Sequence, residues 1–372
     1  MLEGKWRAEI VKIGIIGCGK QADAHAAQIQ KAPGCEIVGV CDMEALLARQ
    51  LAERFNVSQH FDRVEDLLQI ARPDVVHIIT PPQSHFPLGK LCLEAGCHIM
   101  VEKPFTIDFR EAEVLLNLAV AKNRKLTVGH HHQFSDVAIR MRELVRDGFL
   151  GSEPVHMESI FGYDFTDQRY AMALLGDKSH WVRRLPGKLL HNILSHPVSK
   201  IAEFIKDDRP KVVAHGFTSR FLEKINEHEI IDELRVIVLD STSKATAYLT
   251  FSSQISPIQH QLKLYGSRNS LILDYATESL MQIRKTNYKS YLNHIVPPFL
   301  YGRQFLAQSA GNLKRFVART LNFESGRRRL IESFYDSIRD STAEPISYRQ
   351  ILLTSWIMDE IFRQLNEKPA AA

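Results

Sequence analysis

Short apolar runs alternate with helix-like stretches over the first third of the chain. The helix-like stretches cover residues 23–31, 44–55, 86–95 and 108–123. The apolar runs are continuous and rich in β-branched residues, as in strands buried on both faces of a parallel sheet; they are residues 12–16, 36–41, 74–79, 98–101 and 125–129. This alternation predicts an α/β domain with a doubly wound parallel sheet.

The pattern changes after residue 150. Strand-like runs follow one another there with fewer helical segments between them; they are residues 155–161, 211–219, 234–239, 244–252, 260–265 and 270–275. Residues 266–269 indicate a turn, and residues 348–366 predict a closing helix. The second part of the chain therefore predicts a separate domain built around another sheet.

A glycine motif connects the first strand to the first helix. Gly17 and Gly19 precede Lys20, Gln21 and Ala22, which gives the G-x-G-x-x-A form of a Rossmann loop. Gly17 permits a tight turn, and Gly19 lets the backbone approach a pyrophosphate. The helix N-terminus that follows, opened by Lys20 and Gln21, faces the phosphates. The strand before the motif and the helix after it are the context that dinucleotide binding requires.

The end of the second strand predicts the type of cofactor. Asp42 follows that strand directly, where a carboxylate accepts hydrogen bonds from both hydroxyls of an adenosine ribose. It would repel a 2′-phosphate, and Met43 and Glu44 supply no cation to compensate. The sequence therefore favours NAD over NADP.

Two ionisable residues stand at the end of another buried strand. Glu102 and Lys103 follow Val101 and precede Pro104. Placing charged groups at such a position costs free energy, so their presence indicates a function there. The carboxyl ends of strands in an open parallel sheet border the ligand crevice. Lys103 is therefore a candidate proton shuttle for an alcohol–ketone reaction beside a nicotinamide.

Composition bounds the class of protein. The 372 residues suffice for two domains, and the net charge of +4 gives no support to nucleic-acid binding. The five cysteines lack paired spacing and are expected to be small buried hydrophobic residues in a reducing compartment. No apolar stretch approaches the length of about 20 residues that a membrane span needs.

Taken in order, the motifs of the first 135 residues resemble those of the Gfo/Idh/MocA family of sugar and cyclitol oxidoreductases. The resemblance rests on the glycine loop, Thr80-Pro81-Pro82-x-x-His85, Ala95-Gly96-Cys97-His98 and Glu102-Lys103-Pro104. It implies a Rossmann domain over residues 1–130 and an α/β domain with an open, mainly antiparallel sheet over residues 131–347. Residues 348–372 would form a closing helix and tail. It also implies that Lys103 lies beside the nicotinamide C4, and that Thr80, Pro81, His85 and Glu102 line the cofactor.

The second domain departs from the family in one motif. Family members show a glycine triplet, then an aspartate and, four residues later, a histidine on one helix. Here the triplet is reduced to Gly187, Asn192 replaces the aspartate, and His196 matches the histidine. Asparagine can orient a hydroxyl but cannot accept its proton, whereas histidine can. His191 is a second candidate, but it lies about 100° from Asn192 around the helix, and a core position is favoured for it.

Other substrate contacts are weaker candidates. His131 and Gln133 occupy the strand end that the family uses to approach nicotinamide and substrate. Tyr163, Trp181 and Arg183 suit a sugar ring and a phosphate or carboxylate, although a core tryptophan and a surface arginine are equally consistent with the sequence. We expect no metal site at residues 130–132, because alternate residues of a strand point to opposite faces.

These features together indicate an NAD-dependent oxidoreductase that acts on a secondary alcohol of a nucleotide- or lipid-linked sugar. Lys103, His196 and Asn192 form its expected catalytic set. Two alternatives stay open: a closed NAD cycle that gives net epimerisation, elimination or glycoside cleavage, and a non-catalytic dinucleotide-binding regulator. We expect a cytoplasmic homo-oligomer with no nucleic-acid partner.

The stretch least similar to the family is residues 288–329. It is rich in lysine and arginine, has interleaved aromatic residues, and contains Glu324 as its one acid. A helix over residues 300–321 would place Phe305, Leu313 and Phe316 on one face. This layout suits a helix that lies in a membrane interface at the inner membrane face. A helix packed on its own domain and an oligomer contact are the alternatives.

Overall fold

The computed structural model describes residues 10–165, 175–318 and 324–367. The chain divides into two compact units. The first contains Met1–Phe134 and Glu324–Trp356, and the second contains Ser135–Phe323 and Ile357–Ala372.

The first unit contains a six-stranded sheet in which every strand pairing is parallel. The strand order β3-β2-β1-β4-β5-β6 is that of a dinucleotide-binding Rossmann domain. Its strands are β1 (Val11–Ile16), β2 (Cys35–Cys41), β3 (His60–Phe61), β4 (Val75–Ile78), β5 (His98–Val101) and β6 (Leu126–Val128). The predicted parallel sheet is confirmed. Only β3, which is two residues long, was not predicted.

Helices and short helical turns cover this sheet. The main helices are α1 (Lys20–Ile29), α2 (Ala45–Phe55), α4 (His85–Glu94) and α5 (Phe109–Ala121). Shorter segments are α3 (Val64–Asp66), η1 (Leu67–Ala71), η2 (Pro82–Ser84) and η3 (His131–Phe134). The predicted helices of the first third match the four main ones to within three residues at each end. All five cysteines are free thiols, and four of them are buried.

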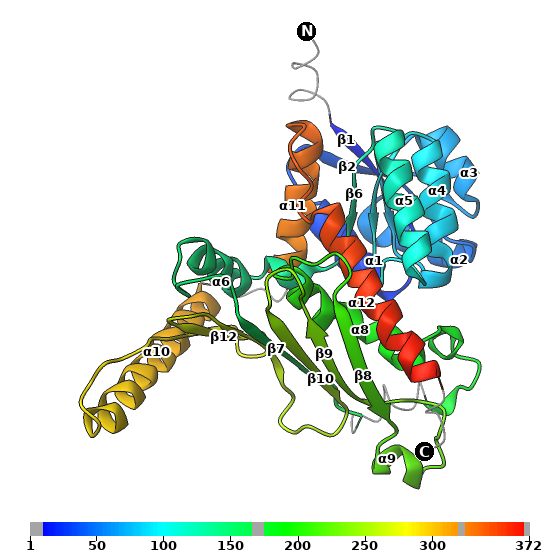
Figure 1. Cartoon of the computed structure of the whole chain (residues 1–372). Helices are drawn as coiled ribbons and strands as arrows, with labels where there is room; N and C mark the ends of the chain where they lie inside the picture. The colour runs from blue at the N-terminus through cyan, green and yellow to red at the C-terminus, as the bar shows by residue number, and fades with distance from the viewer. Residues whose placement is uncertain (1–9, 166–174, 319–323, 368–372) are drawn as a thin grey trace. The chain divides into compact units, whose positions relative to one another are not determined.

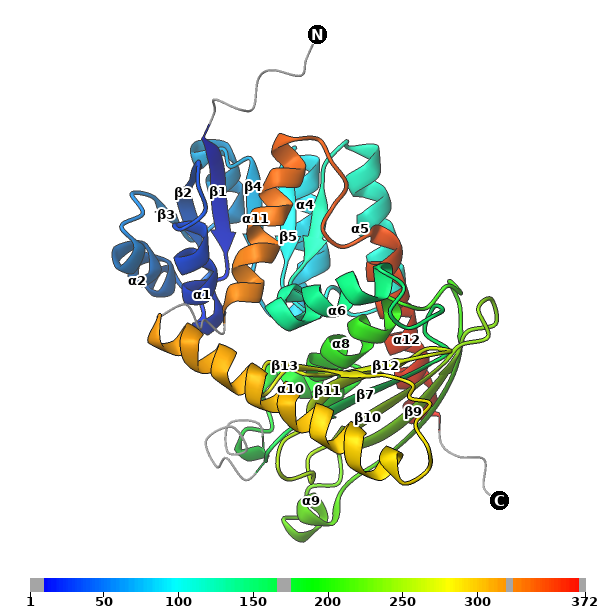
Figure 2. The same ribbon diagram turned by 90° about the vertical axis from the view of Figure 1, so that its left-hand side faces the viewer.

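A helix from late in the sequence completes the first unit. α11 (Ser325–Arg339) packs beside α1 (Figure 2). Its Leu330, Ile331, Phe334 and Tyr335 belong to the core of the first unit. This differs from the predicted division, which placed residues 131–347 in the second domain. The reason is that the apolar face of α11 is buried against the first sheet's core.

The second unit contains a seven-stranded sheet in the order β13-β12-β11-β7-β10-β9-β8 (Figure 1). Only β7 and β10 pair in parallel. Its strands are β7 (His156–Gly162), β8 (Lys211–Phe217), β9 (Glu233–Leu239), β10 (Thr246–Ser252), β11 (His260–Tyr265), β12 (Ser270–Asp274) and β13 (Ser279–Ile283). The predicted mainly antiparallel sheet is confirmed, with β13 as an additional edge strand.

The longest helices of the second unit lie at different parts of this sheet. α8 (Lys188–Ala202) packs on β7 and β10, and α10 (Leu292–Val317) runs beside β13 (Figure 2). The remaining elements are α6 (Asp136–Arg146), η4 (Trp181–Arg184) and α9 (Arg220–Lys224). α12 (Tyr348–Asn366) is the predicted closing helix, and the division between the units falls within it, after Trp356. Within the described ranges, no helix combines the length and apolarity needed to cross a bilayer.

Candidate functional site

The glycine loop has the geometry of a phosphate-binding turn. Gly17 has a φ of +93°, and an added Cβ would lie 2.8 Å from the backbone of Ile79. Any other residue at position 17 would therefore be strained and would collide with the next strand's end. Gly19 borders open space, since a Cβ there would meet no atom within 4 Å. The space beside Gly19 leaves room for a ligand to approach the backbone.

The N-terminus of α1 is open for an anion. Gly19 is its N-cap, and within the described chain no side chain caps the first turn. Lys20 and Gln21, the first two residues of the helix, are exposed. Backbone N–H groups at such a terminus carry partial positive charge and bind phosphate. These residues fit a dinucleotide pyrophosphate, as the motif predicted.

Asp42 is tied to this loop. It follows β2, and its Oδ2 accepts a hydrogen bond from the Cys18 backbone N at 2.7 Å. Its Oδ1 accepts from the Glu44 backbone N at 3.0 Å. Each carboxylate oxygen still has a lone pair for a further donor. The carboxylate therefore has a fixed orientation beside the glycine loop, where an adenosine ribose would lie.

Lys103 and Glu102 follow β5 at the carboxyl edge of the sheet. The Glu102 carboxylate is buried, and its Oε2 accepts from the Lys103 backbone N at 2.9 Å. Gly129 makes room for this group, because a Cβ there would lie 2.9 Å from Glu102 Oε1. Burial lowers the pKa of the Lys103 ammonium, partly opposed by the negative charge of Glu102. Lys103 is thus held by its backbone and shifted toward a neutral amine.

A chain of buried side chains holds Glu102. Its Oε1 lies 2.9 Å from His25 Nε2, and His25 Nδ1 lies 2.9 Å from His77 Nδ1. His77 Nε2 in turn lies 2.8 Å from the Tyr335 hydroxyl on α11. Because an ionised carboxylate only accepts, protons run one way: Tyr335 donates to His77, His77 to His25, and His25 to Glu102. Both imidazoles are then neutral, consistent with the burial that lowers the pKa of each.

Arg327 supplies the positive charge of this network. Its guanidinium is buried and donates to Glu102 Oε1 at 3.4 Å, to Glu324 Oε2 at 2.7 Å and to Gln21 Oε1 at 3.1 Å. Burial alone raises the pKa of Glu102, but the His25 hydrogen bond and the charges of Arg327 and Lys103 outweigh it. The pKa of Glu102 is therefore held well below its usual value.

Arg327 and its partners were not predicted. The sequence analysis assigned residue 327 to a basic membrane-facing stretch, and the structure instead buries it in the first unit. His25 and His77 gave no signal either, since each is an isolated polar residue in an apolar pattern. No local spacing connects residues that lie 225 positions apart.

His85 connects two loops at the carboxyl edge. Its Nε2 lies 2.8 Å from the Thr80 carbonyl oxygen, and its Nδ1 lies 2.9 Å from the Pro104 carbonyl oxygen. The ring is fully buried. His85 therefore fixes the position of Thr80 and of the turn that carries Lys103. Pro81 precedes the short η2 turn as its N-cap, and whether it and Thr80 line the cofactor stays a prediction.

The histidine segment is not a strand. β6 ends at Val128, and His131 to Phe134 form a 3-10 turn, so the alternating orientation that we expected for residues 130–132 is wrong. His130 is buried, and neither of its ring nitrogens has a hydrogen-bond partner among the described residues. His131 lies with its Nδ1 3.3 Å from the Gly129 carbonyl, and burial lowers its pKa to about 4. Within the described ranges, no group of three metal-ligand side chains converges.

In the second unit, α8 presents the predicted pair on one face. Asn192 and His196 are both partly exposed, while the residues between them are buried. The His196 ring stacks on Phe161 of β7, with ring centroids 6.0 Å apart. His191 is buried and stacks on Phe362, as expected for a core histidine. Gly187 allows that packing, because a Cβ there would lie 2.2 Å from Phe362.

Lys200 lies one turn further along the same face of α8, and the sequence analysis did not identify it. It follows His196 by four residues, and its side chain is buried against aromatic rings. Its Nζ forms a hydrogen bond with His260 Nε2 and lies 3.7 Å from the centroid of the Tyr275 ring. Burial puts the pKa of Lys200 well below its ordinary value. The i, i+4, i+8 spacing of Asn192, His196 and Lys200 was the signal that could have found it.

The remaining substrate candidates are distributed around η4 and β7. The Arg183 guanidinium is buried and donates to Glu227 Oε2 at 2.6 Å. The Arg183 guanidinium is therefore already paired inside the second unit, and its geometry does not support a contact with substrate. Trp181 stacks on His180, and Tyr163 follows β7. Both are partly exposed, and their contact with a substrate stays a prediction.

Comparisons with known proteins agree with this geometry. The model of the Gfo/Idh/MocA oxidoreductase family, described as an NAD-binding Rossmann fold, matches residues 11–130. Residues 11–130 thus match the NAD-binding domain of this family. Two relatives are D-glucoside 3-dehydrogenase of Escherichia coli (strain K12) and UDP-N-acetylglucosamine 3-dehydrogenase of Acidithiobacillus ferrooxidans. The first is 33% identical over 142 residues, or 38% of this chain and 40% of that protein. The second is 34% identical over 120 residues, or 32% and 37%.

The match thus spans about two fifths of the length of these curated relatives. A solved structure resembles the whole chain: the WlbA dehydrogenase of Bordetella pertussis in complex with NADH and UDP-GlcNAcA, with a TM-score of 0.75. It is 14% identical, with 96% of this chain and 95% of that one covered. At this identity the likeness shows the fold alone. The predicted cofactor, NAD, agrees with the description of the family model.

The carboxylate of Asp42 gives a test of cofactor choice within this family fold. We expect Asp42→Ala to weaken NAD binding by about 10- to 100-fold, because charge-assisted hydrogen bonds to the ribose are lost. Discrimination against NADP should relax, since the repulsion of a 2′-phosphate is removed. Fluorescence titration with both cofactors measures this. Glu44→Gln, which removes a neighbouring exposed charge, is the control. A wild-type protein that prefers NADP would refute the placement of Asp42 at the ribose.

Proposed function

We propose that the protein is an NAD-dependent oxidoreductase that transfers hydride between nicotinamide and a secondary alcohol or ketone of a sugar derivative. The observation that carries the proposal is the position of Lys103, two residues after the end of β5. It stands at the carboxyl edge of an NAD-binding sheet, where ligands bind in such folds. Glu102, which accepts from His25, Arg327 and the Lys103 backbone N, holds the Lys103 backbone in place.

Two side chains, Lys103 and His196, are proposed to handle protons in this reaction. Lys103 hydrogen-bonds the reacting oxygen, and its already lowered pKa falls further when oxidised nicotinamide, a cation, is bound. His196 accepts the hydroxyl proton during oxidation and returns it during reduction. Asn192, one turn away on the same face of α8, orients the hydroxyl. When bound, the cofactor supplies the hydride acceptor, and the protein supplies position and electrostatics.

The substrate is proposed to be a nucleotide- or lipid-linked sugar. A relative is named for UDP-N-acetylglucosamine, and a protein of the same fold was crystallised with UDP-GlcNAcA. Asn192 at the family's aspartate position is consistent with this class of substrate. Crystals soaked with NAD and candidate nucleotide sugars test the proposal. Sugar density against Lys103 or against His196 supports the role of that residue, and density that reaches neither refutes both roles.

Assays of NADH release decide between net oxidation and a closed NAD cycle. Net dehydrogenation accumulates NADH in proportion to product, whereas a closed cycle converts substrate without accumulation. Tight NAD binding without turnover of any sugar would instead indicate a regulator.

His196→Gln tests the proton-handling role in the second unit. Glutamine keeps a hydrogen-bonding side chain of similar size but cannot accept the proton. We expect kcat to fall by about 10²-fold, while NAD binding stays unchanged. Steady-state kinetics and NAD titration measure the two effects. His228→Gln, which changes an exposed histidine elsewhere in the second unit, is the control. An unchanged kcat in the His196 variant would remove this residue from the mechanism.

Self-association through the second sheet is part of the same proposal. Large apolar side chains are exposed on β8, β9 and β10; they are Val213, Phe217, Ile237 and Tyr248. Exposed apolar surface of this kind marks contacts between proteins. Light scattering gives the mass in solution and tests the point directly.

A further inference from the structure

One face of α10 closes the edge of the second sheet. Gln304 Oε1 accepts from the Gln282 backbone N at 2.9 Å, and Gln304 Nε2 donates to the Gln282 carbonyl at 3.1 Å. Gln308 Oε1 accepts from the Leu280 backbone N. These side-chain amides take the place of a neighbouring strand along β13. They protect an edge that would otherwise pair with another chain.

The opposite face of α10 is apolar and exposed. No residue of this 26-residue helix is buried. At 100° per residue, its central apolar side chains fall within an arc of about 40°. We call them the α10 stripe; they are Ile295, Phe299, Leu306, Leu313 and Val317, and each is more than 60% exposed. Phe305 and Phe316 border the stripe on one side. An exposed apolar stripe of this kind marks a surface that another molecule covers.

The charge of this region has a single sign. Residues 279–323 contain no aspartate or glutamate, and residues 284–317 contain six lysines and arginines. Arg315 is neutralised by Asp136 at 2.7 Å and Glu278 at 3.0 Å. Arg303 and Lys314 lie beside the stripe, on the side opposite Phe305, and neither forms an ion pair within the described part of the chain. Cations at the edge of an apolar face are the arrangement of interfacial helices.

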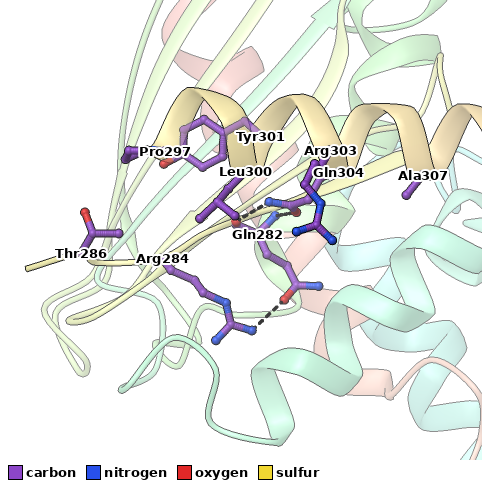
Figure 3. A pocket seen from close by; sticks show the side chains of 9 residues that line it. All are labelled: Gln282, Arg284, Thr286, Pro297, Leu300, Tyr301, Arg303, Gln304 and Ala307. Carbon is purple, nitrogen blue, oxygen red and sulfur yellow. Dashed lines mark hydrogen bonds between the residues drawn. The ribbon is translucent and has the colours of Figure 1, made fainter. Parts of the chain in front are cut away.

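A pocket lies along the flank of α10, between the α10 stripe and the face that closes β13. It encloses about 390 Å³ between α10 and the segment that follows β13. Arg303 from α10 and Arg284 from that segment extend toward the space around Gln282 (Figure 3). Leu300 and Tyr301 line its wall on the helix. Two guanidinium groups beside an apolar wall suit a phosphate attached to an apolar chain.

We propose that the α10 stripe docks on the surface of a membrane that contains anionic phospholipid. Its apolar side chains enter the acyl boundary, and Arg284 and Arg303 bind lipid phosphate. A second copy of the chain is the competing occupant. Pairing two such helices would place cations against cations without any acid to compensate, which disfavours it. An anionic bilayer supplies both the apolar layer and the opposite charge. The proposal does not depend on the proposed reaction.

Flotation with the full chain tests the proposal. We expect binding to phosphatidylcholine vesicles that contain phosphatidylglycerol, much weaker binding to phosphatidylcholine alone, and release by added salt. Leu306→Asp/Leu313→Asp should abolish binding. Arg284→Gln/Arg303→Gln should reduce it by on the order of tenfold or more. The matched controls are Ile70→Asp/Val120→Asp and Arg110→Gln/Arg220→Gln, which change exposed residues elsewhere and should bind as the wild type does.

The opposite results are equally definite. A protein that stays unbound with anionic vesicles at low salt overturns the proposal, as does equal binding to neutral vesicles. If the Leu306/Leu313 variant binds fully, the α10 stripe is not the docking surface. If the Arg284/Arg303 variant binds fully, these two arginines do not bind lipid phosphate. Light scattering without vesicles completes the test. A smaller mass for the Leu306/Leu313 variant alone would show that a second copy covers the stripe.

Discussion

Replacing Lys103 with alanine should lower kcat by about 10²- to 10⁴-fold, the range that a positioned acid–base group typically supplies. NAD binding should stay within about tenfold of the wild type, because the residue has a chemical role rather than a phosphate-holding one. The physical reason is its place after β5, where Glu102 holds its backbone and burial lowers its pKa. Stopped-flow measurement of NADH formation, together with an NAD titration, separates the two effects.

Lys20→Ala is the contrasting variant for this experiment. Lys20 is exposed in the first turn of α1, beside the open N-terminus. Its loss should weaken NAD binding through the phosphates while changing kcat much less. If the Lys103 variant instead retains more than about half of the wild-type kcat, a general acid–base role for Lys103 is wrong.

Much of the first unit follows from local pattern. Each of its longer strands is a continuous apolar run, and the glycine loop has a strand before it and a helix after it. The candidate cofactor-binding residues Gly17, Gly19 and Asp42 could therefore be placed by their order along the chain. The short strands β3 and β13 could not, because two to five residues without a distinctive pattern give no periodic signal.

The buried polar network around Glu102 could not be predicted in this way. Tyr335 and Arg327 reach His77 and Glu102 only because the first unit recruits α11 from late in the sequence. The run Arg327, Arg328 and Arg329 predicts a solvated basic surface when it is considered locally. Only the tertiary fold distinguishes the buried Arg327 from its exposed neighbour Arg328. Buried polar contacts between segments far apart in the sequence produce no regular residue spacing that the sequence alone could reveal.

Arg327→Met should destabilise the first unit by about 3–5 kcal/mol, the usual cost of removing one partner of a buried ion pair. Glu102 would keep His25 and the Lys103 backbone N as donors but would lose its strongest fixed charge. Release of Gln21 from the guanidinium should also weaken NAD binding at the first turn of α1. Denaturant unfolding near neutral pH measures the stability, and an NAD titration measures the second effect.

The pH dependence separates this charge effect from a packing defect. The folded-state pKa of Glu102 lies below its unfolded value, so its ionised form stabilises the protein above the unfolded pKa of about 4.3. That contribution is lost as the pH falls through the folded-state pKa. The deficit of the Arg327 variant should therefore be largest near neutral pH and shrink in acid, whereas a cavity would cost the same throughout.

Arg328→Met is the matched control, because Arg328 forms an exposed i,i+4 pair with Glu332 one residue along the same helix. Such a surface pair contributes only about 0.3–0.5 kcal/mol, so this variant should unfold nearly as the wild type does. The two variants remove the same charge and the same side chain from adjacent positions. Equal stability of the two proteins would show that Arg327 does not hold Glu102 in its ionised state, and that the carboxylate depends on His25 and the Lys103 backbone alone.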